Sequence, residues 1–306
     1  MYQGLPEKSL TLLVGQEHTF KSSLAVLTAK SALDKGFKPV IIDTEGGITK
    51  EFAARWGLDV EKCLYVYSPW AEEIKGVLAQ IKETEERDWC IIIDSIGGID
   101  KMKSYNDALG GLYKQDMGGN ARIIKSTLKL LVNILKAQNS IGVVTSHFYS
   151  SSGLIPMPDS VVGGKSVLLL PDVILYLKKA GKKDTDIAGS DKLINISAIK
   201  NRFYPSAKSG RVSIDYVNGV DTMIGMLDIA LEMDIVQKAG SWYSIDGDKI
   251  GQGATNSLEA ITNNDDLRTD ILNQINDKLK LTGYSTAQDE KMKESIEKLE
   301  NDLLDK

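Results

Sequence analysis

Residues 10–23 read LTLLVGQEHTFKSS, an apolar run followed by a short polar loop that ends in Lys21 and Ser22. The run Leu10–Val14 predicts a buried strand, and residues 22–35 predict a helix directly after the loop. A loop at a helix N-terminus presents backbone N–H groups and the positive end of the helix dipole to an anion. The stretch therefore predicts a phosphate-binding loop, with Lys21 on the β- and γ-phosphates and Ser22 on Mg²⁺.

Phe20 departs from the general phosphate-loop pattern, which has a glycine at this position. Its side chain has to point away from the phosphates, because otherwise it would fill their cradle. For such a loop in isolation, an ordinary strand-to-helix turn without a nucleotide is the alternative. The residues expected to line the nucleotide site are Gly15, Gln16, Glu17, His18, Thr19, Phe20, Lys21, Ser22 and Ser23.

Two further apolar runs end in carboxylates. Asp94 closes the run that begins at Trp89, an arrangement that holds Mg²⁺ through water beside a phosphate loop. Glu45 follows the run that ends at Asp43, and a carboxylate there can orient and deprotonate the water that attacks the γ-phosphate. The alternatives are a turn cap for Asp94 and a solvated loop residue for Glu45.

Apolar runs alternate with helical patterns through the first half of the chain, which predicts βαβ units and a mainly parallel sheet. Three later runs have no helices between them and predict an antiparallel extension of that sheet. Strands are expected at residues 10–14, 39–43, 63–67, 89–94, 141–146, 173–178, 193–199 and 211–216, and helices at 22–35, 50–56, 71–86 and 121–138.

The pattern changes after Asp221 to short helices and a hairpin around Asp246-Gly247, typical of a small α+β domain. We therefore expect an α/β core over residues 1–221, a small domain over 222–285 and an acidic amphipathic helix over 286–306. The amphipathic helix is also consistent with simple packing on its own domain. Two long segments, 95–120 and 148–165, carry no predicted element and follow strand ends, where ligands bind in open α/β sheets.

The composition is that of a globular protein, with 306 residues, 42% hydrophobic and 26% charged. Two cysteines and two histidines exclude a disulfide scaffold and a zinc ligand set. No signal peptide or membrane span is recognised, so a cytoplasmic protein is expected. The net charge is −5, but residues 165–211 hold ten Lys and Arg against four Asp, whereas residues 261–306 hold eleven acids against seven bases.

Seven motifs follow one another along the chain: Gly4-Leu5-Pro6, Phe20-Lys21-Ser22, Asp43-Thr44-Glu45-Gly46-Gly47-Ile48-Thr49, Ile93-Asp94-Ser95, Lys200-Asn201-Arg202, Ala239-Gly240-Ser241-Trp242-Tyr243 and Lys249-Ile250-Gly251-Gln252-Gly253. In this order they resemble the RecA-type recombinases, most closely the UvsX branch of T-even phages. The resemblance spans about residues 4–280, and the UvsX branch also has an aromatic residue before the loop lysine.

The resemblance implies a RecA-type P-loop ATPase core plus a small C-terminal α+β domain. It implies that ATP and Mg²⁺ bind between subunits, with Glu45 as the catalytic glutamate and Ser22 and Asp94 at the metal. Phe52 takes the place of the family's adenine-stacking aromatic, although its spacing suits the core equally well. His147 takes the place of a sensor of the γ-phosphate, or is a polar strand end bonded to a neighbouring loop.

The resemblance also assigns Lys200 and Arg202 to the ATP of a neighbouring subunit, like an arginine finger in trans; a solvated basic strand edge is the alternative. It places DNA-binding loops at about residues 97–119 and 148–165. There, aromatic and apolar side chains would stack on bases and a glycine-rich exit would hold phosphates. These residues are Phe148, Tyr149, Met157, Gly163, Gly164 and Lys165.

The implied function is a single-stranded-DNA-dependent ATPase that forms a nucleoprotein filament and promotes homologous pairing and strand exchange in phage recombination and repair. Its implied partners are single-stranded DNA, homologous duplex DNA, other copies of itself, a recombination mediator and a single-strand-binding protein, in the cytoplasm of a bacterial host. Family members have an N-terminal oligomerisation element before the core, whereas here the phosphate loop begins at Gly15. We therefore expect a shortened chain, a different mode of assembly, or an element supplied elsewhere. A nucleotide- and DNA-binding accessory protein with weak ATP turnover, or a hexameric helicase, are the competing hypotheses.

Overall fold

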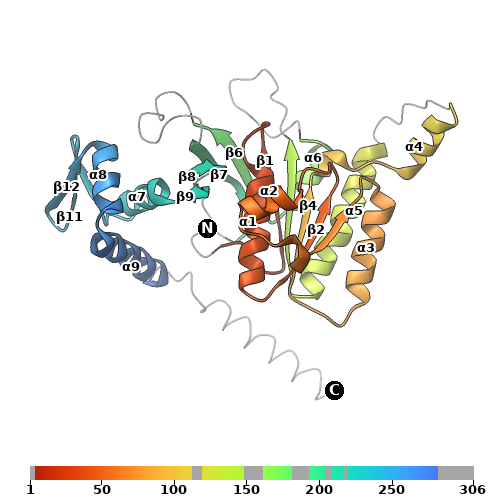
Figure 1. Ribbon diagram of the computed structural model, residues 1–306, viewed down its shortest axis with the longest axis horizontal. Coiled ribbons are helices and arrows are strands. Elements are labelled where there is room, and N and C mark those ends of the chain that lie inside the picture. Colours follow the sequence, from red (N-terminus) through yellow and green to blue (C-terminus); the bar gives the residue numbers. More distant parts are fainter. Residues whose placement is uncertain are drawn as a thin grey trace, which may run out of the picture. The chain divides into compact units, whose positions relative to one another are not determined.

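The computed structural model describes residues 4–111, 119–147, 161–180, 193–203, 209–216 and 219–281 (Figure 1). Contacts divide the chain into two compact units, the first ending at Val220 and the second beginning at Asp221. In this described part of the chain, no helix is both long and apolar enough to cross a membrane.

The first unit is built on a nine-stranded sheet. Its first six strands in spatial order pair in parallel and the next two pairings are antiparallel, so the predicted parallel sheet with an antiparallel extension is confirmed. In spatial order the strands are β3 (Leu64–Tyr67), β2 (Lys38–Asp43), β4 (Trp89–Asp94), β5 (Ile141–His147), β1 (Ser9–Gly15), β6 (Val173–Lys179), β7 (Leu193–Asn201), β8 (Ser209–Asp215) and β9 (Gly219–Asp221).

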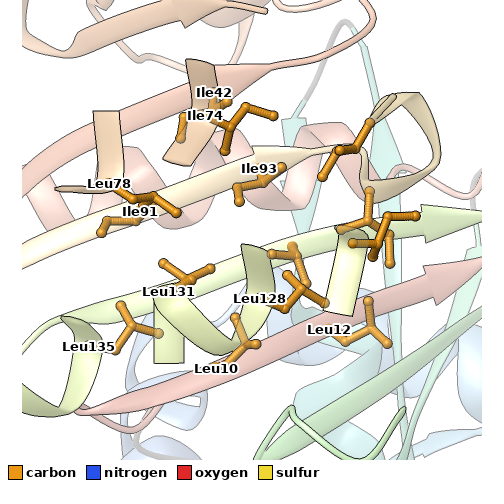
Figure 2. Close-up of a cluster of buried hydrophobic side chains, with 14 of the residues drawn as sticks. Leu10, Leu12, Ile42, Ile74, Leu78, Ile91, Ile93, Leu128, Leu131 and Leu135 are labelled. Carbon is orange, nitrogen blue, oxygen red and sulfur yellow. The ribbon is translucent and has the colours of Figure 1, made fainter. Parts of the chain in front are cut away.

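Helices cover both faces of this sheet because successive side chains of a strand point to opposite faces. Leu10 and Leu12 of β1 face the core that α3 (Ala71–Glu83) and α5 (Gly119–Ala137) cover. Leu13 faces the second core, which α1 (Lys21–Asp34) and α2 (Lys50–Arg55) cover. Figure 2 shows buried side chains of the first core, among them Leu10, Leu12, Ile42, Ile74, Leu78, Ile91, Ile93, Leu128, Leu131 and Leu135.

Two segments without a predicted element contain helices. The first holds the 3₁₀ turn Ile96–Gly98 and α4 (Met102–Leu109), and α6 (Lys165–Leu168) begins at the end of the second. The ring of Tyr105 in α4 lies 5.1 Å from that of Trp70, which precedes α3. This tertiary contact, rather than local propensity in a glycine-rich stretch, accounts for the missed helix.

The second unit combines α7 (Met223–Glu232), α8 (Gly253–Thr262) and α9 (Asp265–Leu281) with a three-stranded antiparallel sheet. Its strands are β10 (Gln237–Ala239), β11 (Trp242–Ile245) and β12 (Asp248–Gln252). Asp246 and Gly247 both have positive φ, at 50° and 93°, as a two-residue hairpin turn between β11 and β12 requires. The hairpin predicted here is confirmed, whereas the helix expected over 286–306 lies outside the described residues.

Candidate nucleotide-binding site

The loop between β1 and α1 is tight enough to require glycine at its first position. A Cβ on Gly15 would lie 2.5 Å from the carbonyl oxygen of Leu177 and 2.7 Å from Oγ1 of Thr19. That Thr19 hydroxyl donates to the carbonyl of Gln16 at 2.8 Å and closes the loop. Backbone and side chain thus leave a narrow cradle at the start of α1, the geometry in which a loop binds phosphate.

Phe20 and His18 take left-handed backbone conformations, with φ of 60° and 57°. Phe20 stands where the general loop pattern has glycine, the residue that this conformation favours. The Phe20 ring packs on the apolar core below α1, and its centroid lies 5.1 Å from the ring of Tyr216. Tyr216 lies in turn 5.9 Å from the ring of Trp56. These contacts place Phe20 among aromatic and apolar partners, as the sequence required of a side chain at this position.

The ammonium group of Lys21 is folded across the loop. Its Nζ donates to the carbonyl oxygens of Gly15 at 3.1 Å and Gln16 at 2.7 Å, and the residue is buried. Burial lowers the pKa of Lys21, and the charges of Asp94, Glu45 and Glu17 oppose that shift. The amine therefore sits among the site's carboxylates on weak carbonyl acceptors that phosphate oxygens can replace.

Asp94 ends β4 and lies against the start of α1. Its carboxylate accepts a hydrogen bond from the hydroxyl group of Thr145 on β5, and the hydroxyl group of Ser22 on α1 lies beside it. Burial raises the pKa of Asp94 above its usual range, the two hydroxyl groups oppose the shift, and Glu45 and Asp43 add to it. The structure thus brings together Ser22 and Asp94, the two residues that the sequence predicted at Mg²⁺.

The oxygen donors of Ser22 and Asp94 fit magnesium, which is commonly held by one or two carboxylates together with substrate phosphates and water. Over the described residues, no group of three or more His, Cys, Asp and Glu side chains is placed to hold a metal ion. A magnesium ion at Ser22 and Asp94 would accordingly complete its shell with phosphate and water oxygens.

Glu45 lies in the loop after β2 and is joined to the loop after β4. The hydroxyl of Ser95 donates to Oε1 of Glu45, and Thr44 forms two hydrogen bonds with the backbone of Ser95, at 2.7 and 2.9 Å. The approach is close: a Cβ on Gly98 would lie 2.4 Å from Oγ1 of Thr44. These contacts fix Glu45 at the same edge of the sheet as Asp94. The sequence analysis did not identify Thr44 or Ser95 as residues that position Glu45.

His147 and Phe52 are the next two predicted residues. His147 ends β5 and lies opposite Gly15 in the strand register, so it is adjacent to the phosphate loop. Phe52 lies on α2, is half-buried and packs against the second core, which fits the core alternative and leaves base stacking a prediction. Of the remaining loop residues, Ser23 is buried in α1, whereas Glu17 is exposed.

Lys200 and Arg202 do not lie near the phosphate loop of their own chain. Lys200 on β7 is opposite Ile174 of β6, whereas Gly15 is opposite Leu177, three residues further along the same strand. The Lys200 amine donates to the carbonyls of residues 168 and 169, at 2.9 and 3.0 Å, and Arg202 also binds the carbonyl of residue 169, at 2.9 Å. Arg202 forms an ion pair with Asp172 at 3.0 Å.

These contacts hold both cations at the far side of β6. Burial lowers the pKa of Lys200, and the charge of Arg202 lowers it further. Any contact between this pair and a nucleotide therefore requires the phosphate loop of another copy of the chain.

The predicted DNA-binding residues are described only in part. Phe148, Tyr149 and Met157 lie outside the described residues. Gly163 and Gly164 lead into α6 with φ of 88° and 74°, conformations that favour glycine. Lys165 is the first residue of α6.

Sequence reasoning gave no role to Tyr216, the aromatic neighbour of Phe20. Tyr216 ends the predicted strand 211–216, and this position is the one sign of it in the sequence. Nothing in the sequence relates that strand to Phe20, which Tyr216 contacts in the structure.

A phosphate loop with a paired hydroxyl and carboxylate, at the carboxyl edge of a parallel sheet, defines a nucleotide-binding α/β protein. The RecA N-terminal domain family matches residues 2–221, and the RecA C-terminal domain family matches residues 225–280. The chain therefore belongs to the RecA family of recombinases. Family members are DNA-dependent ATPases that use ATP with Mg²⁺, and they act in recombination and repair.

Individual relatives agree with this assignment. Protein RecA of Acinetobacter baumannii is 25% identical over 287 residues, which cover 93% of this chain and 80% of the relative. Protein RecA of Pseudomonas putida is 24% identical over 287 residues, covering 93% and 79%. The crystal structure of the RadB recombinase shares the fold, with a TM-score of 0.51 and 18% identity over 71% of this chain and 91% of that one. The narrower UvsX resemblance stays a prediction.

Replacing Asp94 by Asn should stabilise the nucleotide-free protein while weakening Mg²⁺-dependent ATP binding. Asparagine keeps the shape and an acceptor oxygen but has no charge to desolvate. We expect the free energy of unfolding near neutral pH to rise by about 0.5–2 kcal/mol. Because the pKa of Asp94 is raised on folding, the wild type gains stability relative to Asp94→Asn as the pH falls, so the difference shrinks.

Urea unfolding of both proteins over a pH series measures this difference. Asp34→Asn is the matched control, since Asp34 is half-exposed in a surface ion pair with Lys30 and its loss should change stability by less than about 0.5 kcal/mol. An Asp94→Asn protein less stable than wild type at every pH would contradict the account.

Proposed function

We propose that this protein is a single-stranded-DNA-dependent ATPase that assembles on DNA and promotes homologous pairing and strand exchange. The observation that carries the proposal is the buried Lys21 amine on the carbonyls of the Gly15 loop, with Ser22 and the buried Asp94 beside it. The Lys21 amine suits phosphate oxygens, and the Ser22 hydroxyl and the Asp94 carboxylate suit the Mg²⁺ of a bound triphosphate. All three lie beside a loop that has no room for a side chain at Gly15.

The loop residues bind and orient ATP in this mechanism. Backbone N–H groups at the start of α1 receive the β-phosphate, and the Lys21 amine exchanges the carbonyls of Gly15 and Gln16 for β- and γ-phosphate oxygens. Ser22 and Asp94 would hold Mg²⁺, which neutralises charge that develops on the phosphates when it is bound.

Glu45 is the proton acceptor in the proposed reaction. Its Oε1 already accepts a hydrogen bond from Ser95, which leaves Oε2 to take the proton of the attacking water. The new bond forms between the water oxygen and the γ-phosphorus, and the bond to the β–γ bridging oxygen breaks, which releases ADP and phosphate.

A second copy of the chain completes the site. Lys200 and Arg202 are held on the far side of β6 from their own loop, and head-to-tail assembly would place such a surface on the loop of the next subunit. An open head-to-tail series produces a filament, in which each ATP lies between two subunits.

His147 offers a route from the nucleotide to DNA. It lies next to Gly15 in the register and directly precedes the segment with Phe148, Tyr149 and Met157. We assign DNA binding to that segment and to its exit at residues 163–165, through base stacking and phosphate contacts. Bound γ-phosphate would shift the segment toward a DNA-binding state.

The proposal extends to the protein's setting. Phe20, the aromatic residue before the loop lysine, supports membership of the UvsX-like branch and thus a phage recombination system. A recombination mediator and a single-strand-binding protein would then be further partners on the same DNA.

Steady-state ATP hydrolysis with and without long single-stranded DNA tests the proposal. DNA should stimulate hydrolysis, Lys21→Ala should lose ATP binding and hydrolysis together, and Glu45→Gln should still bind ATP but hydrolyse it about 10²–10⁴ times more slowly. Glu51→Gln, an exposed glutamate on α2, is the matched control and should behave like wild type. Absence of stimulation at saturating DNA would contradict the ATPase and favour the accessory protein.

Mixing two inactive variants tests whether Lys200 acts on a neighbour. Lys200→Ala keeps an intact phosphate loop and Glu45, whereas Glu45→Gln keeps intact Lys200 and Arg202. In an equal mixture, about a quarter of the interfaces join an intact loop to intact cations, so hydrolysis should recover to about a quarter of the wild-type rate. A mixture of Lys21→Ala with Glu45→Gln should stay inactive, because both lesions lie in the same half. Failure of the first mixture to recover would contradict action in trans.

A further inference from the structure

Asp43 ends β2 and shapes the loop that carries Glu45. Only 1% of the residue is exposed. Its Oδ1 accepts hydrogen bonds from the backbone N–H groups of Glu45 at 3.0 Å and Gly46 at 2.7 Å. Its Oδ2 accepts from the N–H of Ile48 at 2.8 Å and from the Tyr65 hydroxyl at 3.0 Å. Three donors thus belong to the loop itself, and the fourth comes from a different strand.

That fourth donor lies on β3, the edge strand of the sheet, opposite Ile41 of β2. Burial, followed by the hydrogen bond to Asp43, raises the pKa of Tyr65 to about 12. Its hydroxyl therefore keeps its proton throughout the physiological range and donates it steadily. The adjacent loop approaches this strand closely, since a Cβ on Gly46 would lie 3.3 Å from the ring of Tyr67.

We propose that Tyr65 is a positioning residue for Glu45, acting through Asp43. The inference rests on the proposed function, in which Glu45 accepts the proton of the attacking water. A buried carboxylate with two donors on each oxygen has its plane fixed, and that plane sets where the N–H groups of Glu45 and Gly46 lie. Without the Tyr65 hydroxyl, Oδ2 keeps only the Ile48 donor, and the carboxylate plane is less well defined.

Loss of the Tyr65 hydroxyl should affect ATP turnover and ATP binding differently. Lys21 and the Gly15 loop bind phosphate, and they come from β1 and α1 without contact to Tyr65. Glu45 acts on the reacting water, and a small displacement of a group in that role reduces the rate of the chemical step. Loss of the hydroxyl should therefore lower kcat and leave KM for ATP and the ATP affinity largely unchanged.

Tyr65→Phe removes the hydroxyl and leaves the ring. We expect DNA-stimulated kcat to fall about three- to tenfold, with KM within about twofold of wild type. Tyr67→Phe is the matched control, because it is the same substitution two residues along the same strand. Tyr67 is 60% exposed, and its hydroxyl makes no hydrogen bond within the described residues. This substitution should leave kcat unchanged.

Hydrogen–deuterium exchange of the peptide covering residues 43–48 supplies a readout independent of hydrolysis. The amides of Glu45, Gly46 and Ile48 should exchange faster in Tyr65→Phe than in wild type or Tyr67→Phe. Unchanged kcat with unchanged exchange would overturn the proposal, as would a lower thermal midpoint together with a raised KM, which indicates general structural damage. An inactive wild type would instead contradict the proposed ATPase, and the exchange rates would still decide whether Tyr65 holds the loop.

Discussion

A buried carboxylate at the end of β4 sets the constraint on which the rest of the site depends. Asp94 is only 9% exposed, and burial raises its pKa although the Thr145 and Ser22 hydroxyl groups oppose that shift. Burial has the opposite effect on Lys21, the first residue of α1, because it lowers the pKa of the amine. The charge of Asp94 opposes the shift of Lys21, and the site retains a desolvation cost that phosphates and a divalent cation would offset.

Polar contacts, rather than the apolar core, position Glu45, the third group of the site. Glu45 lies on a loop whose position follows from Asp43 at its base and from Thr44 and Ser95 across to the next strand. Such a network defines one arrangement only while all its members are satisfied. This explains why the Tyr65 hydroxyl on the edge strand β3 matters to Glu45, which lies in the loop after the neighbouring strand β2.

The sequence predicts well what depends on local pattern. Apolar runs that end in Gly15, Asp43 and Asp94 predict parallel strands, and the structure has all three ends at one edge of the sheet. Pairing between distant residues depends on strand order and could not be read from spacing. The contact of Phe20 with Tyr216 and that of Tyr65 with Asp43 are of this kind.

Two further differences have physical causes. Helix α4 was missed because it lies in a glycine-rich segment without a recognised helical pattern; in the structure the ring of its Tyr105 contacts that of Trp70. The resemblance assigned Lys200 and Arg202 to the ATP of a neighbouring subunit, but only the register of β6 and β7 shows that they lie away from the chain's own phosphate loop. In the proposed function, that separation is the reason for a second subunit.

The intersubunit site can be seen directly in an electron cryomicroscopy structure of the protein on single-stranded DNA with Mg²⁺ and a non-hydrolysable ATP analogue. We expect a nucleotide between two subunits, with its phosphates on Lys21 and Ser22 of one copy and Lys200 and Arg202 of the next copy approaching the γ-phosphate. A nucleotide bound elsewhere, or a loop site enclosed by one copy alone, would contradict this expectation.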